Sequence, residues 1–104
     1  MSFVPKGYVK CQKTQVFAGN SIPAIYRERH FTRRGVYEQI HVIRGELMFY
    51  GYKDKEGDVE REVRLKASET AISHPEYWHS IAPLTADTQF EIHFYIKPEA
   101  LNTA

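Results

Sequence analysis

Cysteine is almost absent from this chain, since Cys11 is the only one among 104 residues. A single cysteine excludes an internal disulfide and is most simply read as a small buried apolar residue. No basic segment leads into an apolar run at the amino terminus, and no apolar stretch approaches the roughly 18 residues of a membrane helix. We therefore expect a protein of the reducing cytoplasm that does not enter a membrane.

An excess of charge of one sign is also absent. Lys and Arg total 14 against 13 for Asp and Glu, a formal net charge of +1. This balance lacks the electrostatic footprint of a nucleic-acid-binding protein. The six glycines include no G-x-G pair, so the dinucleotide fingerprint and the phosphate loop are missing. We expect no nucleic-acid partner and no nucleotide cofactor.

The chain length suits one domain over residues 1–104, because two halves would each be too small for a core without disulfides or metals. Aromatic residues make up 13%, which favours β-structure, and apolar residues alternate with period two more often than they recur at helical spacing. The sequence predicts an all-β jelly roll or small barrel of about eight strands without a convincing helix, and a loosely held tail after Pro98. The expected extended segments are 8–17, 24–30, 36–43, 47–52, 59–65, 70–73, 78–82 and 88–96.

Three side chains that bind metals are expected to meet inside this barrel. Glu38 shares strand parity with Ile40 and Val42 and so points to the core. His30 ends the preceding segment, and His79 lies on the inner parity of a later strand. Imidazole and carboxylate suit zinc, ferrous iron, manganese or nickel, and three ligands with an open position are typical of chemistry rather than structure.

Each of these residues also has a structural interpretation. His30 suits a hydrogen-bonded residue at a strand end, and His79 suits a core histidine that donates to a backbone carbonyl. Glu38 suits an ion pair with one of three nearby arginines, which are Arg27, Arg29 and Arg33. The residues alone leave both interpretations open.

The other histidines are weaker candidates. His41 lies on the outward parity of its strand, and His74 precedes a proline in a turn, so both are expected at the surface. His93 alternates against Phe90 and Ile92 and falls on the less apolar face. We keep it as a reserve ligand.

Part of the first cupin motif, G-x5-H-x-H-x3-4-E-x6-G, is present. Glu38 is followed by six residues and then Gly45, and His30 takes the place of the first histidine. The second histidine of the motif falls on Thr32, and five residues separate Thr32 from Glu38. Of the second cupin motif, only the histidine at His79 is kept. The sequence thus resembles a cupin in part.

A closer resemblance is to the small cupin-like family named for the tellurite-resistance protein TehB and the stress-induced protein YeaR. The resemblance spans nearly the whole chain and implies a cupin β-barrel with metal ligands at His30 and His79. Longer TehB proteins add a methyltransferase domain that uses S-adenosylmethionine. This chain lacks the length and the glycine-rich turn for it, so we expect no binding of that cofactor. The matching blocks are Glu28-Arg29-His30, residues 30–37, residues 42–47 running into 49–52, Pro75-x-x-Trp78-His79 and Asp87-x-x-Phe90-x-Ile92-x-Phe94.

Three functions are compatible with these features. The first is a metal-binding cupin of a stress response, with one divalent ion near His30, Glu38 and His79 and any catalysis by Lewis-acid or oxygen chemistry at that ion. The second is a non-enzymatic module that binds a small molecule or an oxyanion. Its charge would come from the arginines of residues 27–34, namely Arg27, Arg29, Arg33 and Arg34. The third is a purely structural homodimer, which needs only an exposed apolar sheet or an edge strand. Separately, we expect a homodimer or larger closed assembly that pairs through the amino-terminal run, which contains Tyr8, Val9 and Val16 to Phe17.

Overall fold

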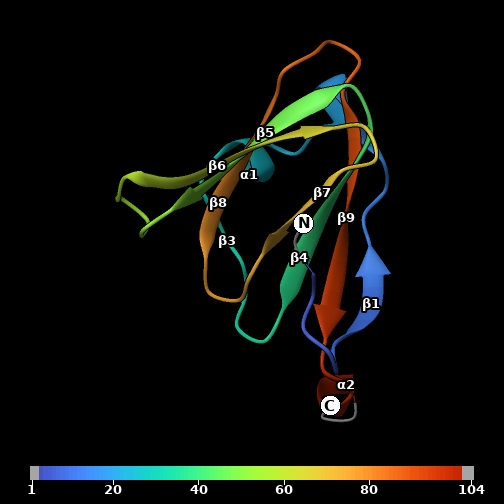
Figure 1. Ribbon diagram of the computed structural model, residues 1–104, viewed down its shortest axis with the longest axis vertical. Coiled ribbons are helices and arrows are strands. Elements are labelled where there is room, and N and C mark those ends of the chain that lie inside the picture. Colours follow the sequence, from blue (N-terminus) through green and yellow to red (C-terminus); the bar gives the residue numbers. More distant parts are fainter. Residues whose placement is uncertain (1–2, 102–104) are drawn as a thin grey trace.

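The computed structural model describes residues 3–101 and consists of two antiparallel β-sheets that face each other (Figure 1). The larger sheet has the strand order β1-β9-β4-β7, with β2 also paired to β9, and the smaller sheet has the order β3-β8-β5-β6. Within residues 3–101 no ladder joins one sheet to the other, so the jelly roll is a sandwich with open edges rather than a closed barrel. The prediction of an all-β cupin-type fold is confirmed.

Nine strands and three short helical segments make up the described chain. The strands are β1 (Val9–Lys13), β2 (Phe17–Ala18), β3 (His30–Phe31), β4 (Tyr37–Arg44), β5 (Glu46–Tyr52), β6 (Val59–Lys66), β7 (Thr70–Ser73), β8 (Trp78–Pro83) and β9 (Gln89–Ile96). The helical segments are η1 (Gly19–Ser21), α1 (Ala24–Arg27) and α2 (Pro98–Leu101). In residues 3–101 no helix has both the length and the apolar character to cross a membrane.

The core lies between the two sheets and follows the predicted alternation. In β4, the buried residues Glu38, Ile40 and Val42 alternate with less buried neighbours. Leu47 and Phe49 of β5 are fully buried against them from the other sheet. Because side chains of a strand alternate between its two faces, this register directs the Glu38 carboxylate into the core with the apolar residues.

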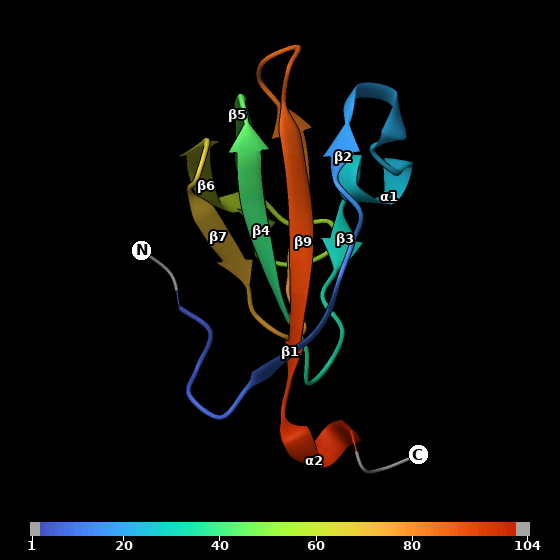
Figure 2. The same cartoon turned by 90° about the vertical axis from the view of Figure 1, so that its right-hand side faces the viewer.

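The segment 24–30 was predicted to be extended, and this is wrong for its first half. Residues Ala24–Arg27 form the helical turn α1, in which the Tyr26 amide donates to the Pro23 carbonyl at 3.0 Å. The fixed backbone angle of Pro23 suits a helix start. Tyr26 of this turn is buried in the core, and Ile22, which precedes the turn in extended backbone, is buried there too. Figure 2 shows α1 beside β2 and β3, at one edge of the sandwich.

The tail and the amino-terminal run also differ from the prediction. A short helix, α2, follows β9, while residues 102–104 of the predicted loose tail lie outside the described residues. The run 8–17 divides into β1 and β2, and every residue of β1 is exposed. Cys11 is therefore exposed rather than buried, because β1 is an edge strand with little packed on it. It lies at a β-bulge, and its thiol donates to the Phe94 carbonyl at 3.4 Å.

Candidate metal centre

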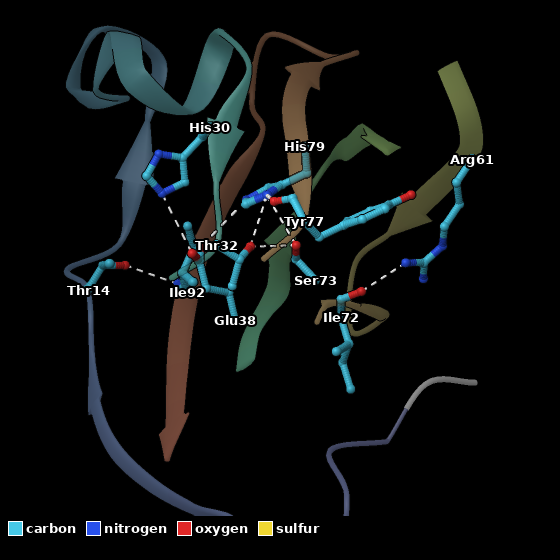
Figure 3. A network of polar contacts seen from close by, with 10 residues as sticks. All are labelled: Thr14, His30, Thr32, Glu38, Arg61, Ile72, Ser73, Tyr77, His79 and Ile92. Carbon is cyan, nitrogen blue, oxygen red and sulfur yellow. Dashed lines mark hydrogen bonds and ion pairs between the residues drawn. The ribbon is translucent and has the colours of Figure 1, made fainter. Parts of the chain in front are cut away.

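Two cross-strand pairs, one in each sheet, build the site. His30 of β3 lies opposite His79 of β8 in the smaller sheet, and Glu38 of β4 lies opposite Ser73 of β7 in the larger sheet. Since the sheets face each other, the two pairs meet between them (Figure 3). The structure thus brings together His30, Glu38 and His79, the three residues that the sequence singled out, with their ligand-type atoms within 4.8 Å of one another.

The carboxylate of Glu38 lies between the two imidazoles. Its Oε1 is 3.5 Å from His79 Nε2, and its Oε2 is 3.6 Å from His30 Nε2. Both separations are too long for good hydrogen bonds. In the described chain Glu38 Oε1 and His79 Nε2 are buried and have no hydrogen-bond partner. A buried polar atom left in this state costs about 1–3 kcal/mol, so the arrangement needs a compensating contact.

The electrostatics of the cluster favour a cation. Burial raises the pKa of the Glu38 carboxyl, but the imidazoles of His30 and His79 lower it by more, and the pKa falls to about 2. Glu38 is therefore ionised at neutral pH. An ionised carboxylate beside two imidazole nitrogens is a set of donors that attracts a positive ion.

Three oxygen atoms lie beside Nδ1 of His79, on the edge of the ring away from Glu38. Its Nδ1 lies 3.2 Å from Thr32 Oγ1, 3.1 Å from Ser73 Oγ and 3.4 Å from the Tyr77 carbonyl. The two hydroxyl groups also hydrogen-bond each other at 2.6 Å. Sequence reasoning noted Thr32 as a replaced histidine but missed Ser73. Its strand was predicted correctly, but only the β4–β7 register shows that Ser73 lies beside His79.

Aromatic rings line the cluster on two sides. The Tyr26 ring packs edge-on against His30 at 5.2 Å, and the Phe49 ring stacks on His79 at 5.7 Å. Burial, and next the charge of Glu38, raise the pKa of the Tyr26 phenol, so this phenol stays protonated at neutral pH. These walls restrict water, and only His30, whose side chain is 27% exposed, reaches the surface.

The arginines proposed as partners of Glu38 point elsewhere. Arg27 donates to the Gly19 carbonyl at 2.9 Å. Arg29 donates to the carbonyls of Lys55 and Gly57 and lies over the ring of Tyr52. In residues 3–101 no ion pair joins an arginine to Glu38, whose charged partners there are His30 and His79. The ion pair with an arginine is therefore not formed.

The structure does not bring the reserve ligand His93 to this cluster. Alternation along β9 gives the inner face to Ile92, so His93 lies on the outer face of the larger sheet. There it stacks on His41 with ring centroids 3.8 Å apart and hydrogen-bonds Glu91 at 2.9 Å. His41 is partly buried by this stack rather than freely exposed. His74 lies in an exposed turn, as predicted.

The glycine of the cupin-like spacing has a structural role. Gly45 joins β4 to β5 with a φ of +71°, a conformation that favours glycine. A Cβ at this position would collide with Thr85, Asp87 and the Thr88 backbone. The spacing between Glu38 and Gly45 therefore combines a core-facing carboxylate with the tight turn that ends its strand.

Two facing antiparallel sheets with His and Glu side chains between them define a cupin-like β-sandwich. The solved cupin domain of Cnp3 from Schizosaccharomyces pombe shares this fold, with a TM-score of 0.50 and 7% identity over 98% of this chain and 61% of that one. A family model described as the TehB-like domain matches residues 12–92. The chain belongs to this TehB-like family.

Relatives in Escherichia coli and Haemophilus influenzae support the assignment. The uncharacterized protein YeaR of E. coli K12 is 33% identical over 94% of this chain and 86% of its own length. A structural-genomics crystal structure of an E. coli K12 protein has a TM-score of 0.87 at 32% identity, covering 94% of this chain and 99% of that one. The crystal structure of H. influenzae TehB has a TM-score of 0.80 at 26% identity, covering 88% of this chain and 32% of that one.

The likeness to TehB concerns about a third of that protein. TehB of H. influenzae is named as a probable S-adenosyl-L-methionine-dependent methyltransferase, and this name refers to the whole chain. That the present chain does not bind this cofactor stays a prediction, which calorimetric titration with S-adenosylmethionine would test.

Proposed function

We propose that this protein holds one divalent metal ion at His30, Glu38 and His79 and acts through that ion in a stress response. Zinc and ferrous iron are the first candidates, with nickel and manganese as alternatives, because imidazole and carboxylate ligands suit all four. The stress response rests on membership of the TehB-like family and on the resemblance to tellurite-resistance and stress-induced proteins. The ion would bind a small molecule or an oxyanion.

One observation carries the metal proposal: Glu38 Oε1 and His79 Nε2 are buried, lack hydrogen-bond partners and lie 3.5 Å apart. Ligands placed about 2.0–2.2 Å from a tetrahedral zinc ion lie about 3.3–3.6 Å from each other. The 3.5 Å between Glu38 Oε1 and His79 Nε2 fits this spacing, and the second carboxylate oxygen, Oε2, lies 3.6 Å from His30 Nε2. A cation between these atoms would give both orphaned atoms a partner.

The same geometry favours a metal over direct binding of an oxyanion. Direct binding needs cationic donors at the site, but two of the four candidate arginines, Arg27 and Arg29, donate to backbone carbonyls away from it, and the other two, Arg33 and Arg34, are exposed. The ionised Glu38 would also repel an anion. A bound divalent ion would outweigh the single negative charge of Glu38 and leave the site positive. An anionic ligand would then be attracted, with access on the side of His30.

Elemental analysis of protein purified without added metal tests the proposal. We expect about one zinc or iron atom per chain in the wild type and none in a folded His79→Ala variant. The His74→Ala variant, which changes an exposed histidine outside the site, serves as the matched control and should keep the metal. If the wild type carries no metal and binds none of the four ions in a titration, the proposal fails.

A further inference from the structure

Thr32 occupies the position at which the cupin pattern has its second histidine ligand, yet it is completely buried and directed at the site. Its hydroxyl hydrogen-bonds the Ser73 hydroxyl at 2.6 Å and lies 3.2 Å from His79 Nδ1. Ser73 is also completely buried and lies 3.1 Å from the same nitrogen. Two buried hydroxyl groups, one just after β3 and one on β7, thus meet at one edge of one imidazole (Figure 3).

The three oxygen atoms at this edge together favour a proton on Nδ1. The Tyr77 carbonyl, 3.4 Å from His79 Nδ1, can only accept a hydrogen bond. A proton on Nδ1 would be shared among this carbonyl and the two hydroxyl oxygens, which can also accept. A neutral imidazole with its proton on Nδ1 has its lone pair on Nε2. That nitrogen is the orphaned one facing Glu38.

We infer that Thr32 and Ser73 are positioning residues that hold the His79 imidazole in the tautomer and orientation in which the Nε2 lone pair points toward Glu38. The inference deepens the proposed metal function and rests on it. Residues that hydrogen-bond the second nitrogen of a ligating histidine fix its tautomer and raise its basicity. Where the cupin pattern has a second histidine ligand, this chain has Thr32, whose hydroxyl would act with that of Ser73 to orient His79.

The first test measures the tautomer without metal. We expect ¹⁵N NMR of the apoprotein to show the His79 proton on Nδ1, with the signals assigned by comparison with His79→Gln. Replacing both hydroxyls, in Thr32→Val with Ser73→Ala, should move a measurable fraction of the proton to Nε2. A wild-type proton on Nε2 would overturn the inference whether or not the protein binds metal.

The second test measures zinc affinity. Thr32→Val and Ser73→Ala should each bind zinc about 10–100-fold more weakly, as loss of an outer-shell partner typically does. Thr32→Ser, which keeps the hydroxyl, should restore affinity. Ser80→Ala is the matched control, because Ser80 is a buried neighbour of His79 whose hydroxyl bonds Tyr52 instead. It should bind zinc like the wild type.

The results separate this inference from the proposed function. If the wild type binds zinc and Thr32→Val and Ser73→Ala bind it as tightly as Ser80→Ala does, the positioning role is wrong and the metal site stands. If the wild type binds no metal, the proposed function is wrong, and the NMR tautomer alone decides the role of the hydroxyl pair.

Discussion

A carboxylate lies beside imidazole groups on each face of the larger sheet, and on the inner face these imidazoles come from the smaller sheet. On the inner face, Glu38 lies between His30 and His79. On the outer face, Glu91 hydrogen-bonds His93, which stacks on His41. The two clusters use the same residue types and differ in how their polar atoms are satisfied.

The outer cluster satisfies its own hydrogen bonds. Glu91 Oε1 accepts from His93, and Glu91 Oε2 pairs with Lys13 at 3.1 Å. His41 Nε2 hydrogen-bonds the Gln39 side-chain oxygen at 2.7 Å. The inner cluster instead keeps two buried atoms without partners. The presence of histidine and glutamate therefore does not distinguish the two clusters, whereas the buried polar atoms without hydrogen-bond partners occur in the inner one.

The largest expected effect is on metal binding in His79→Ala. Loss of this ligand should abolish zinc binding or weaken it beyond the roughly 10–100-fold cost of losing an outer-shell group. The β fold should survive, which circular dichroism would check. His93→Ala is the control from the outer cluster and should bind zinc normally. An unchanged affinity in the folded His79→Ala protein would reject the ligand role.

Replacing the Glu38 carboxylate by an amide should have the next largest effect on metal binding. Glu38→Gln keeps the shape of the side chain but removes its charge, and we expect a loss of metal affinity of about 10–100-fold. Glu91→Gln changes the outer cluster in the same way and should leave affinity unchanged. Isothermal titration with zinc measures both. A Glu38→Gln titration that matches the wild type would favour a purely structural carboxylate.

The outer cluster should instead affect stability as a function of pH. Burial and next the charge of His93 lower the pKa of His41 from 6.5, helped by Lys10 and opposed by Glu91. The unfolded chain then takes up this proton at higher pH than the folded chain does. The free energy of unfolding therefore falls as the pH drops below about 6.5 and stops falling from this cause below the folded pKa.

Denaturant unfolding at several pH values from 7 to 5 would measure this contribution. His41→Gln removes the titrating group, so its stability should fall less steeply than that of the wild type over this range. His74→Gln, at an exposed turn histidine, should keep the wild-type slope. Equal slopes for the wild type and His41→Gln would contradict the account of the stacked pair.

The smallest expected effect concerns the open edge of the larger sheet. Strand β1 lies at the edge of the larger sheet, and all five of its residues are exposed. An edge strand offers backbone groups that a second copy can pair with. We predict a homodimer joined at β1, weakened by Val9→Asp. Sedimentation that finds only monomer at micromolar concentration would contradict this prediction.

The parity of strand residues could be predicted from the sequence, and most of the site followed from it. Glu38 alternates with Ile40 and Val42, and this alternation correctly gave its direction. The convergence of His30 and His79 was likewise expected. Alternation is a local property of the chain, so it can be predicted without knowledge of the neighbouring strands.

Features that depend on pairing between distant segments could not be predicted in this way. The place of Ser73 beside His79 follows from the register of β4 with β7. The exposure of Cys11 follows from the edge position of β1, which composition does not reveal. The helical turn α1 was missed for a different reason, because it is a local feature of the chain. Its four residues are too few for a clear helical period.

The central claim is that the inner cluster, and not the outer one, holds a metal ion. Anomalous diffraction from crystals of the zinc-loaded protein, recorded on both sides of the zinc absorption edge, tests it most directly. The account predicts one peak about 2.0–2.2 Å from Nε2 of His30, Nε2 of His79 and a carboxylate oxygen of Glu38. A peak beside His41 and His93 with none between the sheets, or no peak in fully loaded crystals, would contradict it.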